Sequence, residues 1–434
     1  MSPLSLRLEA SEMPLPARKL SRRWFVAGAG MAITSIGLPT GPRAEVASDG
    51  FRVLSARPGA GAGRGEARPQ VWSYEGTLPG PTLRLKRGGE ARVRLVNELP
   101  EPTSVHWHGV RLPNAMDGVP HLTQPPVTPG TSFDYFFRPP DAGTFWYLAF
   151  APGQVDRGLY GALIVEEPEP ADVDRDILLV LGMPVDPGGS PPAPLVLVNG
   201  SVRPDIPVKA GERLRLRLIN ATSARGFALR VEGHSPWVMA FDGQPAEPFI
   251  ARDGRIALGP GSRADLFVDT LQSPGTMTSI RAGFPDEQPI ARLAYESGGS
   301  ARAARRADPL PLPSNPLPAR IDLKSSLKVE LALAGAKSLD PAGPPLFTVR
   351  RGRAVTLGIR NPTGHPHAVH LHGHHFRLLD RLDDGWKPFW LDTFVVAEQV
   401  ERIAFVADNP GRWLIHCRRL EHADTDMAVW FAVS

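Results

Sequence analysis

The residue types best suited to chemistry gather near the end of the 434-residue chain, around its only cysteine. Cys417 is preceded by His416 and followed by His422 five residues later and by Met427 ten residues later. A thiolate, an imidazole and a thioether suit copper that cycles between Cu(I) and Cu(II), in a trigonal His₂Cys set with a long axial Met. The run therefore predicts most of a blue copper site, which needs one more His from elsewhere.

Two upstream segments supply further imidazoles. Residues 367–374 read HAVHLHGH, and residues 106–109 read HWHG. Side chains two residues apart on a strand lie on the same face, so His370 should lie beside His372, and His106 beside His108. Two strands with paired imidazoles predict a second metal centre beside the thiolate site.

The strands that must position these residues belong to a unit that occurs three times. The three copies read GGEARVRLVN at 88–97, GERLRLRLIN at 211–220 and GRAVTLGIRN at 352–361. Each has a turn Gly, an alternating strand and an Asn nine residues after the Gly. Repeats this far apart indicate domain duplication, and short alternating strands in a chain with 43 Gly and 47 Pro favour β-sandwiches.

Together these segments resemble the three-domain multicopper oxidases, the laccase and cuprous oxidase group. The resemblance covers nearly the whole chain after the first fifty residues. Besides the two His segments it rests on GTFWY at 143–147, GLYG at 158–161 and DNPG at 408–411. It implies an all-β fold of three tandem cupredoxin-like Greek-key β-sandwich domains. We place them at residues 51–168, 169–296 and 319–434, with a linker at 297–318 and the blue copper site in the last.

The resemblance also implies ligand sets for copper. The type 1 (blue) site would take His367, Cys417, His422 and Met427. The three-copper cluster of the family takes eight His, and five positions match: His106 and His370 for type 2 copper, and His108, His372 and His416 for the type 3 pair. Leu148, Phe150 and Arg418 stand where the family has the other three.

These three replacements remove ligands from the type 3 pair. Leu148 and Phe150 offer no lone pair, and the Arg418 guanidinium is a permanent cation. We therefore do not expect a bridged type 3 pair, or the four-electron reduction of O₂ that depends on it. Asp117 matches the acidic residue that assists proton delivery in the family, although an Asp before a Gly is equally typical of a turn.

Residues 1–50 are predicted to be a leader outside the fold. Residues 21–26, SRRWFV, with the weakly apolar run that follows, resemble a twin-arginine export signal and imply a periplasmic location. The apolar run is too short for a stable membrane anchor. The net charge is only +4, and Arg clusters only at 302–306, so nucleic acid binding is not indicated.

The favoured hypothesis is a copper oxidoreductase. It would oxidise a small-molecule reductant or a redox protein one electron at a time at the type 1 copper, and pass electrons through Cys417 and His416 to a reduced second centre. That centre would hold one copper on His106, His370 and a third imidazole, with O₂ or another small molecule as acceptor.

Three alternatives stay open. One is a blue-copper electron carrier or copper-binding protein without turnover. Another is a copper-free structural relative that supports cell division, although this does not explain a complete blue site. The third is a full laccase in which His374, His375 or His121 completes the cluster. His374 is the best of these, since alternation would place it on the face of His372.

Overall fold

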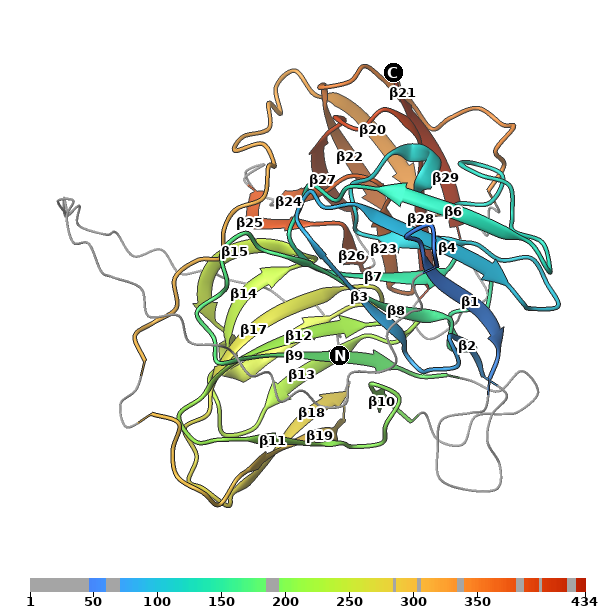
Figure 1. Ribbon diagram of the computed structural model, residues 1–434. Coiled ribbons are helices and arrows are strands. Elements are labelled where there is room, and N and C mark those ends of the chain that lie inside the picture. The colour runs from blue at the N-terminus through green and yellow to red at the C-terminus, as the bar shows by residue number, and fades with distance from the viewer. Residues whose placement is uncertain are drawn as a thin grey trace. The chain divides into compact units, whose positions relative to one another are not determined.

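The computed structural model describes residues 47–59, 71–184, 195–283, 286–302, 306–333, 339–379, 386–397, 400–419 and 427–434. Residues 1–46, which include the predicted export signal, lie outside this range. The described chain is built of strands, with two short 3₁₀ helices at Asn114–Met116 and Arg252–Gly254. The strands form six sheets, which follow the chain in three consecutive pairs (Figure 1). The predicted all-β fold of tandem sandwiches is confirmed.

The first sandwich contains β1 (Arg52–Pro58), β2 (Trp72–Tyr74), β3 (Gly80–Lys86), β4 (Ala91–Asn97), β5 (Val105–His108), β6 (Ser132–Phe137), β7 (Gly143–Ala149) and β8 (Tyr160–Glu166). The second contains β9 (Arg175–Gly182), β10 (Leu197–Val198), β11 (Asp205–Val208), β12 (Arg213–Asn220), β13 (Phe227–Val231), β14 (Trp237–Phe241), β15 (Gln244–Ile250), β16 (Arg255–Leu258), β17 (Arg263–Asp269), β18 (Met277–Gly283) and β19 (Glu287–Tyr295). The third contains β20 (Leu327–Ala332), β21 (Thr348–Val349), β22 (Ala354–Arg360), β23 (His367–Leu371), β24 (Phe376–Leu379), β25 (Trp386–Leu391), β26 (Thr393–Val396), β27 (Val400–Val406), β28 (Gly411–Arg419) and β29 (Met427–Val433).

The three sandwiches share one strand order. In the first sheet of each, the repeat strand β4, β12 or β22 has a parallel neighbour on one side and an antiparallel neighbour on the other. The second sheets share the order β3-β8-β7-β5, β11-β19-β18-β13 and β21-β29-β28-β23, and the last two continue with β16 and β26. Strands β5, β13 and β23 are therefore equivalent, and those of the first and third sandwiches carry histidines.

The Asn that ends each repeat fastens the loop that follows it. Asn97, Asn220 and Asn361 are buried. Each donates its side-chain N–H groups to carbonyls of its own loop and of a neighbouring segment, and accepts the backbone N–H two residues later. Because a buried amide needs hydrogen-bond partners, this shared role explains why all three repeats end in Asn.

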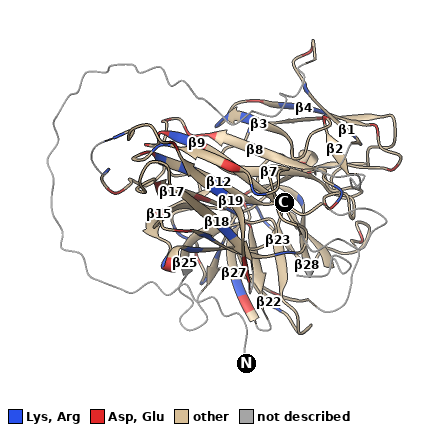
Figure 2. Cartoon of the chain, turned by 90° about the horizontal axis from the view of Figure 1, so that it is seen from below, with Lys and Arg blue, Asp and Glu red and all other residues tan. Residues whose placement is uncertain are grey.

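Buried arginines of the second sandwich contact the first sandwich. The Leu residues of β12 face the core of their sandwich, and Arg213, Arg215 and Arg217 alternate to the other face with about 1% exposure. Arg217 bonds Asp265 of β17 and the Thr144 hydroxyl of β7, the latter at 2.9 Å. Figure 2 shows basic and acidic segments close together around β9 and β12. These contacts hold β7, and with it the neighbouring β5, against the second sandwich.

The described parts of the predicted linker, residues 297–302 and 306–318, form no strand. The segment is nevertheless bound to the first sandwich, since the Asn315 amide accepts from the N–H of Ala142 and donates to its carbonyl, both at 2.8 Å. The domain boundaries 51–168, 169–296 and 319–434 stay predictions.

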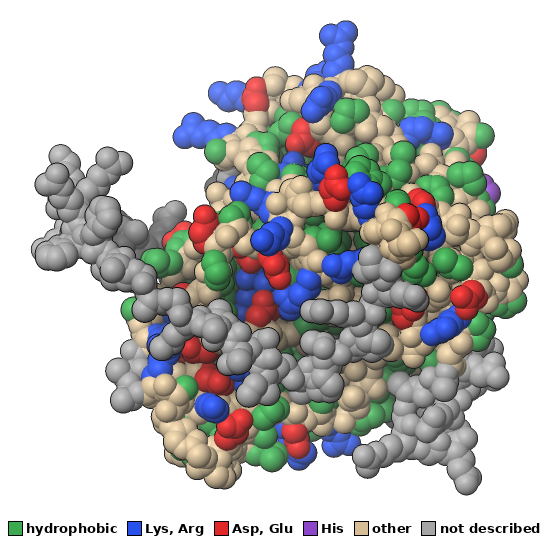
Figure 3. Space-filling view, viewed as in Figure 1, with side chains coloured by type: hydrophobic (Ala, Val, Ile, Leu, Met, Phe, Trp, Pro, Cys, Tyr) green, Lys and Arg blue, Asp and Glu red, His purple; other side chains and the backbone are tan. Residues whose placement is uncertain are grey.

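Among the described residues, no helix has the length and apolar character that a membrane span requires. On the face in Figure 3, side chains of both charges are interspersed with apolar ones.

Candidate metal centre

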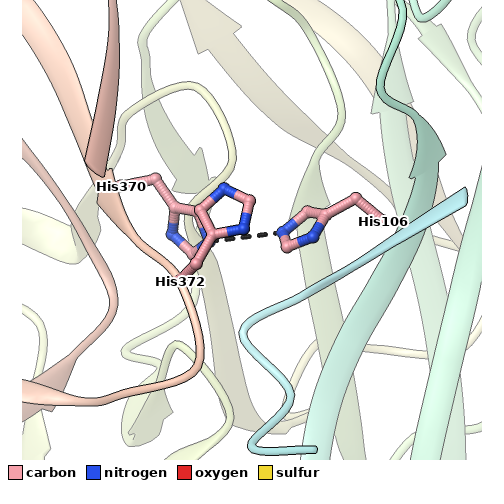
Figure 4. A group of neighbouring side chains, drawn as sticks. All are labelled: His106, His370 and His372. Carbon is pink, nitrogen blue, oxygen red and sulfur yellow. Dashed lines mark hydrogen bonds between the residues drawn. The ribbon is translucent and has the colours of Figure 1, made fainter. Parts of the chain in front are cut away.

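Histidines from the first and third sandwiches meet in space. His106 comes from β5, His370 from β23, and His372 from the residue after β23 ends. Figure 4 shows His106 approaching from one side and His370 and His372 from the other. All three are at most 3% exposed, and ligand nitrogens of the three lie within 4.8 Å of one another. The Nε2 atoms of His106 and His370 are 3.4 Å apart.

The Nδ1 atom of each of these rings donates a hydrogen bond to an oxygen atom of an aspartate residue. His106 Nδ1 donates to the Asp117 carbonyl at 2.9 Å, and His370 Nδ1 to the Asp392 carbonyl at 2.9 Å. His372 Nδ1 donates to Asp117 Oδ2, also at 2.9 Å. Oxygen acceptors on Nδ1 place the proton there, so in each neutral ring the Nε2 lone pair faces inward.

This arrangement fits a cation. Two inward lone pairs 3.4 Å apart repel each other, and the buried His372 Nε2 has no hydrogen-bond partner in the described chain. A buried polar atom without a partner is costly. Neutral imidazoles with Nδ1 fixed by a carbonyl or carboxylate are what copper and zinc sites use.

Burial keeps two of these imidazoles neutral. It lowers the pKa of His372 to about 3, helped by nearby His106 and opposed by the Asp117 carboxylate. Burial also lowers the pKa of His370, against the opposing effect of Asp392. For Asp117 itself burial raises the pKa, but His372 and His106 outweigh it, so its pKa is lowered and it stays a carboxylate.

We therefore expect copper binding at this centre to change little with acidity. If two ligand imidazoles had an ordinary pKa near 6.5, the affinity of the site for copper would fall roughly 500-fold between pH 7 and pH 5, because the metal competes with protons for the ring nitrogens. His372, with a pKa of about 3, is neutral at both pH values, and the pKa of His370 is lowered from its ordinary value, so the loss from these two imidazoles should stay below about 30-fold. Chelator competition at both pH values, with the blue band followed separately, measures it. A loss of several hundredfold would contradict the expectation.

The Nε2 atom of His108 is bonded outside this group. It lies 2.9 Å from the Thr393 hydroxyl and 3.5 Å from Asp392 Oδ1, and the ring of His108 stacks on His370 at 3.7 Å. Asp392, His108 and His370 form a second close group, but Arg263 from the second sandwich already occupies the Asp392 carboxylate. Neither Asp392, Thr393 nor Arg263 was singled out from the sequence. None of them lies in a ligand motif, although Asp392 and Thr393 follow the HAVHLHGH segment.

Two apolar side chains lie where the family has imidazoles. Leu148 of β7 pairs with His106 of β5, and it is buried in an apolar cluster with Trp146 and Tyr160. Phe150 is half-buried and meets His106, His372 and His416 edge-on, with ring centroids 5.5 to 5.8 Å apart. The apolar volume expected at these positions is therefore in contact with the histidine group. The side chain of Arg418 lies outside the described part.

The candidate blue site is next to the group, on the same strands. Cys417 of β28 is 1% exposed, and its Sγ lies 3.5 Å from His367 Nδ1. Met427 of β29 pairs directly with Cys417. The Thr363 hydroxyl donates to Asn361 Oδ1 and so accepts from His367 Nε2, which leaves the His367 Nδ1 lone pair toward the sulfur. His422 lies outside the described residues.

His416 connects the two candidate sites. It pairs with His370 across β28 and β23, and its ring centroid lies 5.6 Å from that of His370 and 5.1 Å from that of His372. Because neighbouring residues of a strand face opposite ways, Cys417 and His416 serve opposite faces of the same sheet.

Four further histidines lie outside this group. His374 bonds the His372 carbonyl and the Asn409 N–H, and packs on Phe405, Trp413 and Phe431. It is therefore not placed to complete the group. His375 contacts Gln244 and Asp242 of the second sandwich, His121 is exposed, and His234 bonds Tyr295 as a structural residue.

Comparisons with known proteins find multicopper oxidases. Three family models, each described as multicopper oxidase, match residues 60–170, 180–292 and 314–434. The chain is 30% identical to the multicopper oxidase MmcO of Mycobacterium tuberculosis, covering 82% of both chains. It is 28% identical to Laccase-2 of Fomitopsis schrenkii, covering 82% of this chain and 84% of that one. A multi-copper oxidase crystal structure from Pseudomonas thermotolerans superposes with a TM-score of 0.79 at 32% identity, covering 88% and 98%.

Proposed function

The chain belongs to the three-domain, laccase-like multicopper oxidases, and from this premise we propose a copper-dependent oxidoreductase with a reduced second centre. It would oxidise a reductant one electron at a time at a type 1 copper held by His367, Cys417, His422 and Met427. Electrons would pass through His416 to a single copper on His106, His370 and His372. The observation that carries this is the convergence of three buried histidines, whose ligand nitrogens lie within 4.8 Å of one another, while Phe150 packs against the rings of His106 and His372.

Each protein group has a part in this scheme. Copper supplies one-electron chemistry when bound. Cys417 and His416, adjacent on β28, give electrons a covalent route between the two sites. Asp117, the residue proposed for proton delivery, accepts a hydrogen bond from His372 Nδ1–H through its carboxylate and one from His106 Nδ1–H through its carbonyl. The lowered pKa of its carboxyl group suits an acceptor better than a proton donor. Phe150 and Leu148 keep water and further metal away from one side of the group.

Export and partners extend the same proposal. The SRRWFV segment and the apolar run after it support twin-arginine export to the periplasm, a route that carries folded proteins. Two further relatives bear the names laccase and copper resistance protein A. The proposed partner is a small-molecule reductant, such as a phenol or Cu(I), or a redox protein, with O₂ or another small molecule as acceptor.

Copper content and the absorption spectrum of the oxidised protein test the proposal. We expect two coppers per chain and the intense visible band of a thiolate–Cu(II) site, without the near-ultraviolet band of a bridged copper pair. Four coppers with that band would contradict the reduced centre. No visible band would contradict the type 1 site and favour the copper-free structural alternative.

An electron carrier without turnover is the second candidate, and Phe150 favours it because its edge lies against three histidine rings. It predicts one copper per chain and reversible reduction without consumption of an acceptor. Stopped-flow reduction followed by exposure to air separates the two candidates, because only the proposed oxidoreductase passes its electrons to an acceptor and returns to the oxidised state for another turnover.

A further inference from the structure

Arg263 of β17 is a fully buried cation from the sandwich that supplies no proposed ligand. Its Nη1 donates to Asp392 Oδ1 at 2.8 Å, and its Nη2 donates to Asp392 Oδ2. Nη1 also donates to the Gly261 carbonyl and Nε to the Thr144 carbonyl. Such a bidentate pair fixes both the charge and the orientation of the carboxylate.

The fixed carboxylate determines the direction of the next hydrogen bond. The Thr393 hydroxyl donates to Asp392 Oδ1 at 2.8 Å. A hydroxyl has one hydrogen, so Thr393 Oγ1 can only accept from its other neighbours. Those neighbours are His108 Nε2 at 2.9 Å and His370 Nδ1 at 3.0 Å.

From this geometry we infer that Arg263 is a positioning residue. By orienting Asp392 and Thr393, it selects the tautomer of His108 and fixes the ring of His370, whose Nδ1–H also donates to the Asp392 carbonyl. It holds Asp392, Asp392 holds the Thr393 proton, and Thr393 accepts N–H from each imidazole. His370 is then protonated on Nδ1 and presents Nε2 to the metal. His108 is protonated on Nε2, which leaves its lone pair on Nδ1. The inference rests on the proposed single-copper centre.

The HWHG motif agrees with this role for the pair. A side chain at Gly109 would begin 2.1 Å from Arg263 Nη2 and 2.4 Å from Asp392 Oδ2. The glycine directly after His108 therefore leaves room for the guanidinium–carboxylate pair. Its φ of +81° adds a second reason for Gly at this position.

Arg263→Lys keeps the charge but loses the bidentate geometry. We expect copper at the second centre to bind about 10-fold to 100-fold more weakly, the usual cost of changing a group behind a metal ligand. The type 1 visible band should be unchanged. In the copper-free protein, long-range ¹H–¹⁵N spectra should show His108 as a tautomer mixture in place of a single form, while His370 keeps its proton on Nδ1 through the Asp392 carbonyl.

Arg213→Lys is the matched control. Arg213 is equally buried in the same layer and makes a bidentate pair with Asp269, without contact to Asp392. It should leave affinity within about twofold and the tautomers unchanged. An equal effect from both variants would overturn the inference, because general loosening would explain it. Unchanged affinity and tautomers in Arg263→Lys would also overturn it.

If Arg263→Lys does not fold, the double variant Arg263→Gln/Asp392→Asn takes its place. It replaces the ion pair by two amides and is judged by the same tautomer criterion. Absence of second-centre copper in the unaltered protein would refute the proposed function. The copper-free spectra would still decide the role of Arg263, so the two failures are distinguishable.

Discussion

Cys417→Ser is expected to abolish the visible thiolate–Cu(II) band and electron entry, while leaving second-centre copper in place. The sulfur is 1% exposed, lies 3.5 Å from His367 Nδ1 and pairs across the sheet with Met427. A hydroxyl is a poor substitute for a soft anionic ligand. Since changes behind a ligand already cost about 10-fold to 100-fold, oxidation of phenols or Cu(I) should fall more than about 100-fold.

Absorption, copper content and turnover measure this together. Met427→Leu is the companion variant, because it removes only the weak axial ligand and should keep the band while shifting the reduction potential. A Cys417→Ser protein that remains coloured, or that still oxidises substrate at the unaltered rate, would refute Cys417 as a ligand.

Leu148→His/Phe150→His/Arg418→His is expected to raise copper content from two to four per chain and to introduce the near-ultraviolet band of a bridged pair. The first two positions already touch the group: Leu148 pairs with His106, and Phe150 lies against three imidazoles. Without metal, a new buried imidazole lacking partners should destabilise the fold by about 1–3 kcal/mol. Copper should restore that stability.

Phe150→His alone is the control for the triple variant, because it supplies only one of three missing ligands and should bind no coupled pair. Copper analysis, spectroscopy and thermal unfolding with and without copper follow both variants. If the triple variant folds, binds two coppers and lacks the new band, the three replacements are not what distinguishes this centre from a full cluster.

Strand pattern and repeats allowed the fold to be predicted. The three Gly-to-Asn segments became equivalent strands, because alternation gave each one a buried face and the final Asn closed its loop. The position of His106 opposite His370 could be expected only through the family resemblance. Nothing local to β5 or β23 indicates that two sandwiches dock at these strands.

Alternation was reliable inside strands and unreliable beyond them. It did not hold for His374, because β23 ends at Leu371 and Gly373 turns with φ +67°, which takes His374 toward Trp413. Alternation also gave no indication that Thr393 of β26 would bond the Nε2 of His108. The Arg263–Asp392 pair spans 129 residues and carries no sequence signal.

The separation of His106 and His370 by 264 residues also affects the order of events during synthesis. At roughly 5–20 residues per second, the ribosome needs about 13–53 s to make the second histidine after the first. Until then His106 and Asp117 have no partner across the sandwich interface. The centre can therefore form only after the last sandwich has emerged and docked. Copper bound there marks a chain that has been completed and folded from end to end.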